Sequence, residues 1–248
     1  MCACMVLLVL HVLTCSATVC RNRLQALWKW ASTNMRHNDP SDPRFGYFAW
    51  HCSPDTGKWL DPNPASDGET YFATALYMAA ARFQDASYAE AANIILEVAT
   101  NKTTPTNRGG ISNMFVNDTG VAGAEQQVVF VPYGQSASFT DPSYHLPAFY
   151  QYWSTQYQPT ANNGGSSYGA AFWEQTVNAS RAFFKLGAAN SKPGLMADYS
   201  TFAGVPTGSG VNNKFAFDAW RVAQNVAMDY AWYAADPWQV VVHFAPLP

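Results

Sequence analysis

Acidic residues gather in and just before the stretch Asn63–Phe83 of this 248-residue sequence. Asp67 and Glu69 open an apolar segment with helical spacing, and Asp55 and Asp61 lie in the loop that precedes it. A helix start attracts negative charge, so the residues alone favour a capping role for both acids. Carboxyl groups held in one place also serve general acid–base catalysis, and this second interpretation stays open.

The composition limits the partners that we expect. Charged residues make up 12 % of the chain, aromatic residues 15 %, and the formal net charge is −3. A nucleic-acid binder normally carries a basic patch, so we expect no nucleic-acid partner. Many aromatic rings among few charges suit a neutral, hydroxyl-rich ligand such as a sugar, and they suit a large aromatic core equally well. The sequence has no Cys-x-x-Cys motif and no His pair at zinc spacing, so we expect no metal site, and we predict no cofactor.

The first 20 residues differ from the rest of the chain. They contain four of the five cysteines and a short apolar run, Met5–Thr14, which resembles a signal-peptide core and is too short to span a bilayer. No Lys or Arg precedes this run, and no clean cleavage site follows it. We therefore interpret residues 1–20 as a signal-like or out-of-frame segment. The protein is expected in the cytoplasm, or outside the cell if the segment is a true signal peptide, and no membrane partner is expected.

Helical periodicity recurs along the remaining chain, with Pro-, Gly- and aromatic-rich loops between the periodic segments. Helices are predicted over residues 21–35, 68–83, 86–101, from about 144 onward, over 168–190 and over 217–236, with Ser87 as a candidate cap. Residues 102–140 read as short strands and turns, which leaves little room for a central sheet. This pattern predicts an all-α helical toroid with long, aromatic-rich loops at one end.

Four motifs occur in an order that resembles glycoside hydrolase family 8, and most of all its branch of reducing-end xylose-releasing exo-oligoxylanases. They are GYFAWH (46–51), PASDGETYFATALYMAAARF (64–83), SFTDPSYHLPAFY (138–150) and FDAWRVAQNVAMDYAWYAADPW (217–238). The resemblance implies an (α/α)6 barrel and assigns residues 21–248 to a glycoside hydrolase catalytic domain. It implies hydrolysis of β-1,4 bonds in xylo-oligosaccharides with inversion, releasing xylose from the reducing end. An endo-acting xylanase, glucanase or chitosanase of the same family remains an alternative.

The resemblance also assigns roles to residues. Asp218 stands where this branch carries the general base, and a helix start would favour its charged form. Asp67 stands where the family carries the aspartate that contacts the sugar in the −1 subsite, and Tyr144 matches a tyrosine that holds the attacking water. Capping for the two acids, and packing in the barrel wall for Tyr144, are the structural alternatives.

Five further residues are candidate substrate contacts: Trp50, His51, Asp141, His145 and Arg221. Trp50 could stack on a sugar ring or belong to the core. His145 is by default a hydrogen-bonded structural residue. Arg221 lies three residues after Asp218 and could pair with it. Asp229, three helical turns further along, is expected to support a contact between helices instead of reaching the same site.

The sequence departs from the family at both ends. The family's general-acid glutamate should fall near Val6, but no Asp or Glu precedes Asp39. The resemblance also stops after Trp238. A truncated or frame-shifted coding sequence would explain both departures and predicts a partial barrel without its general acid. Two rivals therefore remain, a catalytically impaired sugar-binding remnant and a helical toroid whose aromatic residues are all core.

Overall fold

The computed structural model describes residues 17–102, 110–117, 119–121, 125–159, 168–191 and 195–239, and all structural statements concern these ranges. Of residues 1–20, which the sequence analysis interprets as a signal-like or out-of-frame segment, residues 1–16 lie outside the described residues and residues 17–20 belong to the first described helix. The described chain divides into two compact units. The first holds the residues up to Asn113 together with 156–159, and the second holds Met114–Thr155 and the residues from Tyr168 onward. The assignment of residues 21–248 to one catalytic domain stays a prediction.

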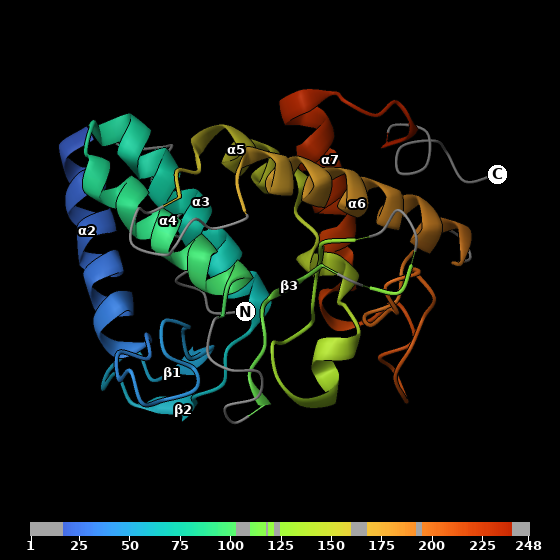
Figure 1. Ribbon diagram of the computed structural model, residues 1–248, viewed down its shortest axis with the longest axis horizontal. Helices are drawn as coiled ribbons and strands as arrows, with labels where there is room; N and C mark the ends of the chain where they lie inside the picture. The colour runs from blue at the N-terminus through green and yellow to red at the C-terminus, as the bar shows by residue number, and fades with distance from the viewer. Residues whose placement is uncertain are drawn as a thin grey trace. The chain divides into compact units, whose positions relative to one another are not determined.

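The first unit is built on three helices, α2 (Ala17–Asn34), α3 (Ser66–Phe83) and α4 (Ala86–Thr100). Helices α3 and α4 run side by side (Figure 1), joined by a tight connection in which Gln84 adopts a left-handed conformation with a φ of 52°. The cap of α4 is Asp85, whose carboxylate accepts hydrogen bonds from the backbone N–H and the hydroxyl of Ser87. The prediction of Ser87 as the cap was therefore wrong by two residues, because Asp is as good an acceptor at this position.

A long aromatic loop covers the start of α3 in the first unit. Within it, Phe48 forms an isolated bridge with Arg36, and β1 (His51–Cys52) pairs antiparallel with β2 (Trp59–Asp61). The ring of Phe48 lies 4.8 Å from that of Phe72 and 6.0 Å from that of Trp28, measured between ring centroids. The aromatic run around Phe48 therefore packs α2 against α3.

In the second unit, two of the longer helices are preceded by a short 3-10 helix. Its longer elements are α5 (Pro147–Gln156), α6 (Ala170–Ala189) and α7 (Arg221–Tyr233); its shorter ones are β3 (Phe115–Val116), β4 (Gln127–Val128), η2 (Gly134–Ser138), η3 (Pro142–Tyr144) and η4 (Phe217–Trp220). The sequence predicted one helix from Tyr144 and one from Phe217. The first is split, because Pro147 cannot continue a helix and instead takes the first position of α5.

Aromatic packing and a buried ion pair between two helices stabilise the second unit. The ring of Phe115 lies edge-on to those of Tyr150 and Trp173, at centroid distances of 5.5 and 5.2 Å. Arg181 on α6 donates two hydrogen bonds, of 2.8 and 2.7 Å, to the fully buried carboxylate of Asp229 on α7. Asp229 thus supports a contact between helices, as the sequence predicted.

The described chain is all-α in class. Its six α-helices carry nearly all of the regular structure, and its four strands are only two or three residues long. Over the described ranges, no helix is both long enough and apolar enough to cross a membrane.

Candidate active site

A cavity of about 530 Å³ opens in the second unit and collects three acidic side chains. Its lining residues come from the segments around β4, η3, η4 and the loop before η4: Phe130, Asp141, Tyr144, Asp198, Tyr199, Asn212, Phe217 and Asp218. The sequence had singled out three of these eight. The structure therefore brings Asp141, Tyr144 and Asp218 together although more than 70 residues separate the first two from the third.

Asp218 is the most exposed of the three acids that line this cavity. Its side chain is 40 % exposed, and its Oδ2 accepts a 2.7 Å hydrogen bond from Nη2 of Arg221, as their spacing predicted. Arg221 itself is 1 % exposed, and its guanidinium lies 5.3 Å from the centroid of the Tyr144 ring. The buried cation thus links the accessible carboxylate to the tyrosine.

The η3 turn holds Tyr144 in a fixed position. Asp141 caps the turn by accepting a 2.7 Å hydrogen bond from the backbone N–H of Ser143. The hydroxyl of Tyr150 donates to the carbonyl oxygen of Tyr144 at 2.9 Å, and the side chain of Asn225 on α7 donates to the carbonyl oxygen of Ser143 at 2.8 Å. Buried groups from α5 and α7 therefore fix the backbone on which Tyr144 stands.

Asp141 differs from Asp218 in its electrostatics. It is 2 % exposed, and burial raises the pKa of its carboxyl to about 8, with the charge of Asp198 adding to the rise and the Ser143 hydrogen bonds and Arg221 opposing it. At neutral pH this carboxyl therefore keeps its proton. It can donate a hydrogen bond inside the cavity, but it cannot serve as a base there.

Asp198 and Tyr199 are site residues that the sequence analysis missed. Asp198 is 3 % exposed, burial raises the pKa of its carboxyl, and the backbone N–H of Asp218 donates a hydrogen bond to it. Burial, followed by the nearby carboxylates, raises the pKa of Tyr199 to about 12. Asp198 is the one charged residue between Leu195 and Val211, and that isolation was the available signal. Despite these acids, the described residues contain no group of three or more His, Cys, Asp or Glu side chains that could hold a metal ion.

His145 does not line the cavity. It is fully buried, its two ring nitrogens lie 3.0 Å from the hydroxyls of Thr140 and Ser180, and its ring stacks on Phe183 at 4.1 Å. Burial lowers the pKa of His145 to about 3, so the ring stays neutral. These contacts agree with the expectation that His145 is a hydrogen-bonded structural residue. They give no support to a role of His145 in substrate binding.

The remaining sequence-predicted residues belong to the first unit. Trp50 is 36 % exposed, and its ring lies 5.0 Å from that of His51. Asp67 is 7 % exposed and lies inside α3, whose cap position is taken by Ala65 without a side-chain hydrogen bond. Asp67 is therefore not the N-cap residue of this helix, but it lies in the first turn, where a carboxylate favours the helix start.

Glu69, in the same helical turn as Asp67, has a structural role. It is 2 % exposed, and its Oε1 accepts a 2.9 Å hydrogen bond from the backbone N–H of Phe48. Burial raises the pKa of Glu69 to about 8 against the opposing effect of that hydrogen bond. Glu69 thus anchors the aromatic loop that leads to Trp50 and His51.

Comparisons with known proteins agree with this geometry. The family described as "Glycosyl hydrolases family 8" matches residues 12–247. The chain is 35 % identical over 228 residues to the reducing-end xylose-releasing exo-oligoxylanase Rex8A of Paenibacillus barcinonensis, in a match that covers 89 % of this chain and 53 % of that protein. It therefore spans about half the length of this curated relative.

Solved structures give the same result. A mutant of Rex8A in complex with an arabinofuranosyl-xylotetraose matches with a TM-score of 0.77 and 31 % identity, over 95 % of this chain and 56 % of that one. A xylobiose complex from Teredinibacter turnerae matches with a TM-score of 0.77 and 35 % identity, over 95 % of this chain and 59 % of that one. The all-α fold of the (α/α)6-barrel type that the sequence predicted is confirmed.

Proposed function

This chain belongs to glycosyl hydrolase family 8, and on that premise we propose that it hydrolyses β-1,4 bonds of xylo-oligosaccharides with inversion, with Asp218 as the general base. The observation that carries this proposal is the pairing in the cavity of one exposed carboxylate with a buried cation. Asp218 is 40 % exposed and Arg221 is 1 % exposed, with 2.7 Å between their bonded atoms. Such a carboxylate can take a proton from a water molecule while its partner holds it in place.

The other cavity residues fit supporting roles in this proposal. Tyr144 stands beside the guanidinium of Arg221 and would hydrogen-bond the attacking water next to the base. Asp198 accepts the backbone N–H of Asp218, so it would act as a positioning residue for the turn that carries the base. Asp141, with a pKa of about 8, would donate a hydrogen bond to a sugar hydroxyl.

Asp67 would contact the sugar in the −1 subsite, where an oxocarbenium-like ring benefits from a nearby carboxylate. Ala65, and not Asp67, is the N-cap residue of α3, which is compatible with this role. Trp50 and His51 would offer ring faces to the sugar, and the exposure of Trp50 supports this. The release of xylose from the reducing end is proposed by analogy with the relatives named above.

Inverting hydrolysis also needs a general acid, and the sequence around its expected position favours a second candidate function. The family's acid is a glutamate that should fall near Val6, and residues 1–38 of this sequence contain no Asp or Glu. We propose that the chain is impaired on substrates whose leaving group needs a proton, since general acid catalysis is worth about 10²–10⁴-fold. If hydrolytic activity is lost completely, the chain is a sugar-binding remnant.

Two substrates separate these possibilities, because fluoride leaves without a proton and a sugar alkoxide does not. We would follow β-xylobiosyl fluoride and xylotriose by proton NMR with the purified chain. The proposal predicts that the fluoride is consumed, that α-xylobiose appears first, and that xylotriose survives.

The other outcomes are equally informative. The β-anomer as first product would contradict inversion, and equal consumption of xylotriose would show that an acid is present. Xylose as the single small product from xylohexaose would then favour the exo reaction over an endo-acting relative. Binding of xylobiose without any turnover would favour the second candidate, a sugar-binding remnant without catalytic activity.

A further inference from the structure

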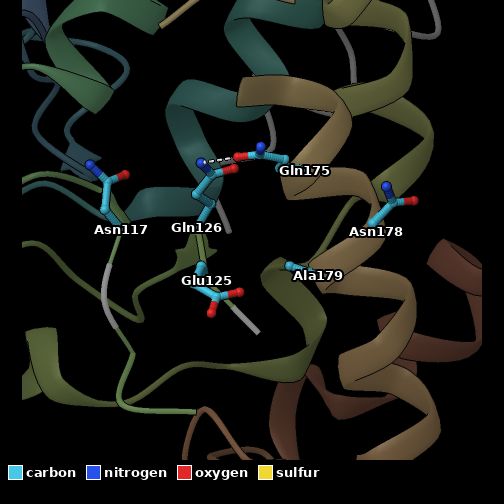
Figure 2. A pocket seen from close by; sticks show the side chains of 6 residues that line it. All are labelled: Asn117, Glu125, Gln126, Gln175, Asn178 and Ala179. Carbon is cyan, nitrogen blue, oxygen red and sulfur yellow. Dashed lines mark hydrogen bonds between the residues drawn. The ribbon is translucent and has the colours of Figure 1, made fainter. Parts of the chain in front are cut away.

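A second hollow in the same unit shares no lining residue with the active-site cavity. Its volume is about 450 Å³, within the range of about 300–1,000 Å³ that is usual for small-molecule sites. It is lined by Asn117, Glu125, Gln126, Gln175, Asn178 and Ala179 (Figure 2). Ala179 is the one apolar residue among these six, so the hollow is unsuited to an apolar ligand.

Helix α6 builds one wall of this amide-lined hollow. Gln175, Asn178 and Ala179 lie three and four residues apart, which places them on one face of the helix. The two amides are outside the buried core, whereas Ala179 is 4 % exposed and its short side chain leaves room between them. The helix therefore presents two amide groups around a gap.

The opposite wall holds its amides in fixed orientations. Nε2 of Gln126 donates a 2.6 Å hydrogen bond to Oε1 of Gln175, drawn as a dashed line in Figure 2. Nδ2 of Asn117 donates to the hydroxyl of Tyr168 at 3.0 Å. Gln126 also adopts a left-handed backbone conformation with a φ of 65°, which is unfavourable for a residue other than glycine. Strain at a lining residue is common where a site is built for a ligand.

One polar atom of a lining residue lacks a protein partner. Oε1 of Gln126 is buried and accepts no hydrogen bond from any part of the chain that the structure describes. A buried acceptor without a donor is costly, so a rotation of this side chain that lets Oε1 accept from a hydroxyl group in the hollow would be favoured.

We propose that this hollow is a second binding site for a neutral oligosaccharide. Each side-chain amide offers both donors and an acceptor, and each sugar hydroxyl does the same, so the four amides match a hydroxyl-rich ligand. The carboxylate of Glu125 disfavours anions, and five of the six lining residues carry a polar side chain that can hydrogen-bond a hydroxyl group. The choice of xylo-oligosaccharides as the ligand rests on the proposed function.

The test is an NMR titration that reads both sites at once. The full chain carrying Asp218→Asn, labelled with ¹⁵N, is titrated with xylotetraose, which it should not consume. Side-chain NH₂ signals report on the amide-lined hollow, and the Gln175 pair is identified by its loss in Gln175→Ala. Backbone signals of Tyr144 and Tyr199 report on the active-site cavity.

We expect the Gln175 and Asn178 side-chain signals to shift along a saturable curve. Gln175→Ala should weaken the affinity reported by Asn178 at least tenfold, and Asn178→Ala should do the same to the affinity reported by Gln175. Glu174→Ala is the matched control, because Glu174 is the exposed neighbour on α6 that does not line the hollow. It should leave both curves unchanged.

The two proposals fail separately in this experiment. Shifts at the active-site cavity without shifts of the hollow amides would overturn the second site and leave the proposed function standing. Shifts of the hollow amides alone would support the second site and count against the proposed function. Equal affinities for the parent and Gln175→Ala, or no shifts at all, would overturn the second site.

Discussion

The first turn of α3 in the first unit carries Asp67 and Glu69, and the first turn of η4 in the second unit carries Asp218. Glu69 and Asp218 have opposite surroundings. Glu69 is 2 % exposed and is held by a backbone N–H, whereas the side chain of Asp218 is 40 % exposed and is held by a guanidinium. Burial raises the pKa of Glu69 to about 8, which makes it a neutral anchor at pH 7. We therefore propose that the partner and the exposure of these two acids, more than their places in a helix, make Glu69 structural and Asp218 catalytic.

The largest effect on stability is expected at Arg221, the buried cation that pairs with Asp218. Arg221→Ala should lower the free energy of unfolding by about 3 kcal/mol, because it removes a fully buried side chain and leaves a cavity beside the ring of Tyr144. Arg44→Ala is the control, since the Arg44–Asp42 ion pair lies in the first unit and is partly exposed. Its loss should cost less than about 1 kcal/mol. Equal losses in urea denaturation would contradict the contrast.

Glu69 tests the first region. Glu69→Ala should lower the free energy of unfolding by about 2 kcal/mol, since the buried N–H of Phe48 would lose its acceptor. Glu69→Gln keeps an oxygen at that position and resembles the neutral acid, so it should cost less than about 0.5 kcal/mol. If Glu69→Gln were as damaging as Glu69→Ala, the acid would need its charge, and its role as a neutral anchor would be wrong.

The two buried acids should make stability fall as the pH rises from about 6.5 to 8. In this range the folded chain keeps the protons of Glu69 and Asp141, whose pKa values are about 8, while the unfolded chain has released them. Below about pH 6.5 the slope is opposed by His145, whose folded pKa of about 3 means that only the unfolded chain is protonated. The urea midpoint should therefore drop between pH 6.5 and 8, and Glu69→Gln with Asp141→Asn should flatten this drop. A midpoint that rises over the same range would contradict the assignment.

The smallest effect is expected at Asp198. Asp198→Asn keeps an oxygen that can accept the backbone N–H of Asp218, so fluoride release from β-xylobiosyl fluoride should fall by no more than about threefold. Asp198→Ala removes the acceptor and should lower the rate about tenfold. The pH at which the rate is half-maximal should also move in both variants, because a neighbouring acid is removed. If the pH dependence of fluoride release did not change, Asp198 would contribute to packing and not to the chemistry of the site.

The helices and part of the site could be predicted from the sequence because the signals are local. Apolar spacing located α3, α4 and α6 within a few residues, and Pro147 marked the start of α5. The motifs that resemble family 8 identified Asp218 and Tyr144, which the structure then places in one cavity.

The missed features depend on contacts between distant segments. Asp198 joins the site because the neighbouring Ser200 pairs with Thr140 and because Asp218 donates its N–H across a loop, neither of which any spacing reveals. His145 leaves the site because its ring turns toward Ser180 and Phe183 on α6. The amide-lined hollow likewise depends on the contact between β4 and α6, and no sequence motif predicts that contact.

The measurement that tests the central claim most directly compares fluoride release from β-xylobiosyl fluoride by Asp218→Asn and Glu69→Gln at one pH, with the parent chain beside them. If the exposed, guanidinium-paired acid is the base and the buried acid is an anchor, Asp218→Asn loses at least about 100-fold and Glu69→Gln stays within about twofold of the parent. Asp218→Asn at the parent rate would contradict the assignment of the base. A loss confined to Glu69→Gln would move the chemistry to the start of α3.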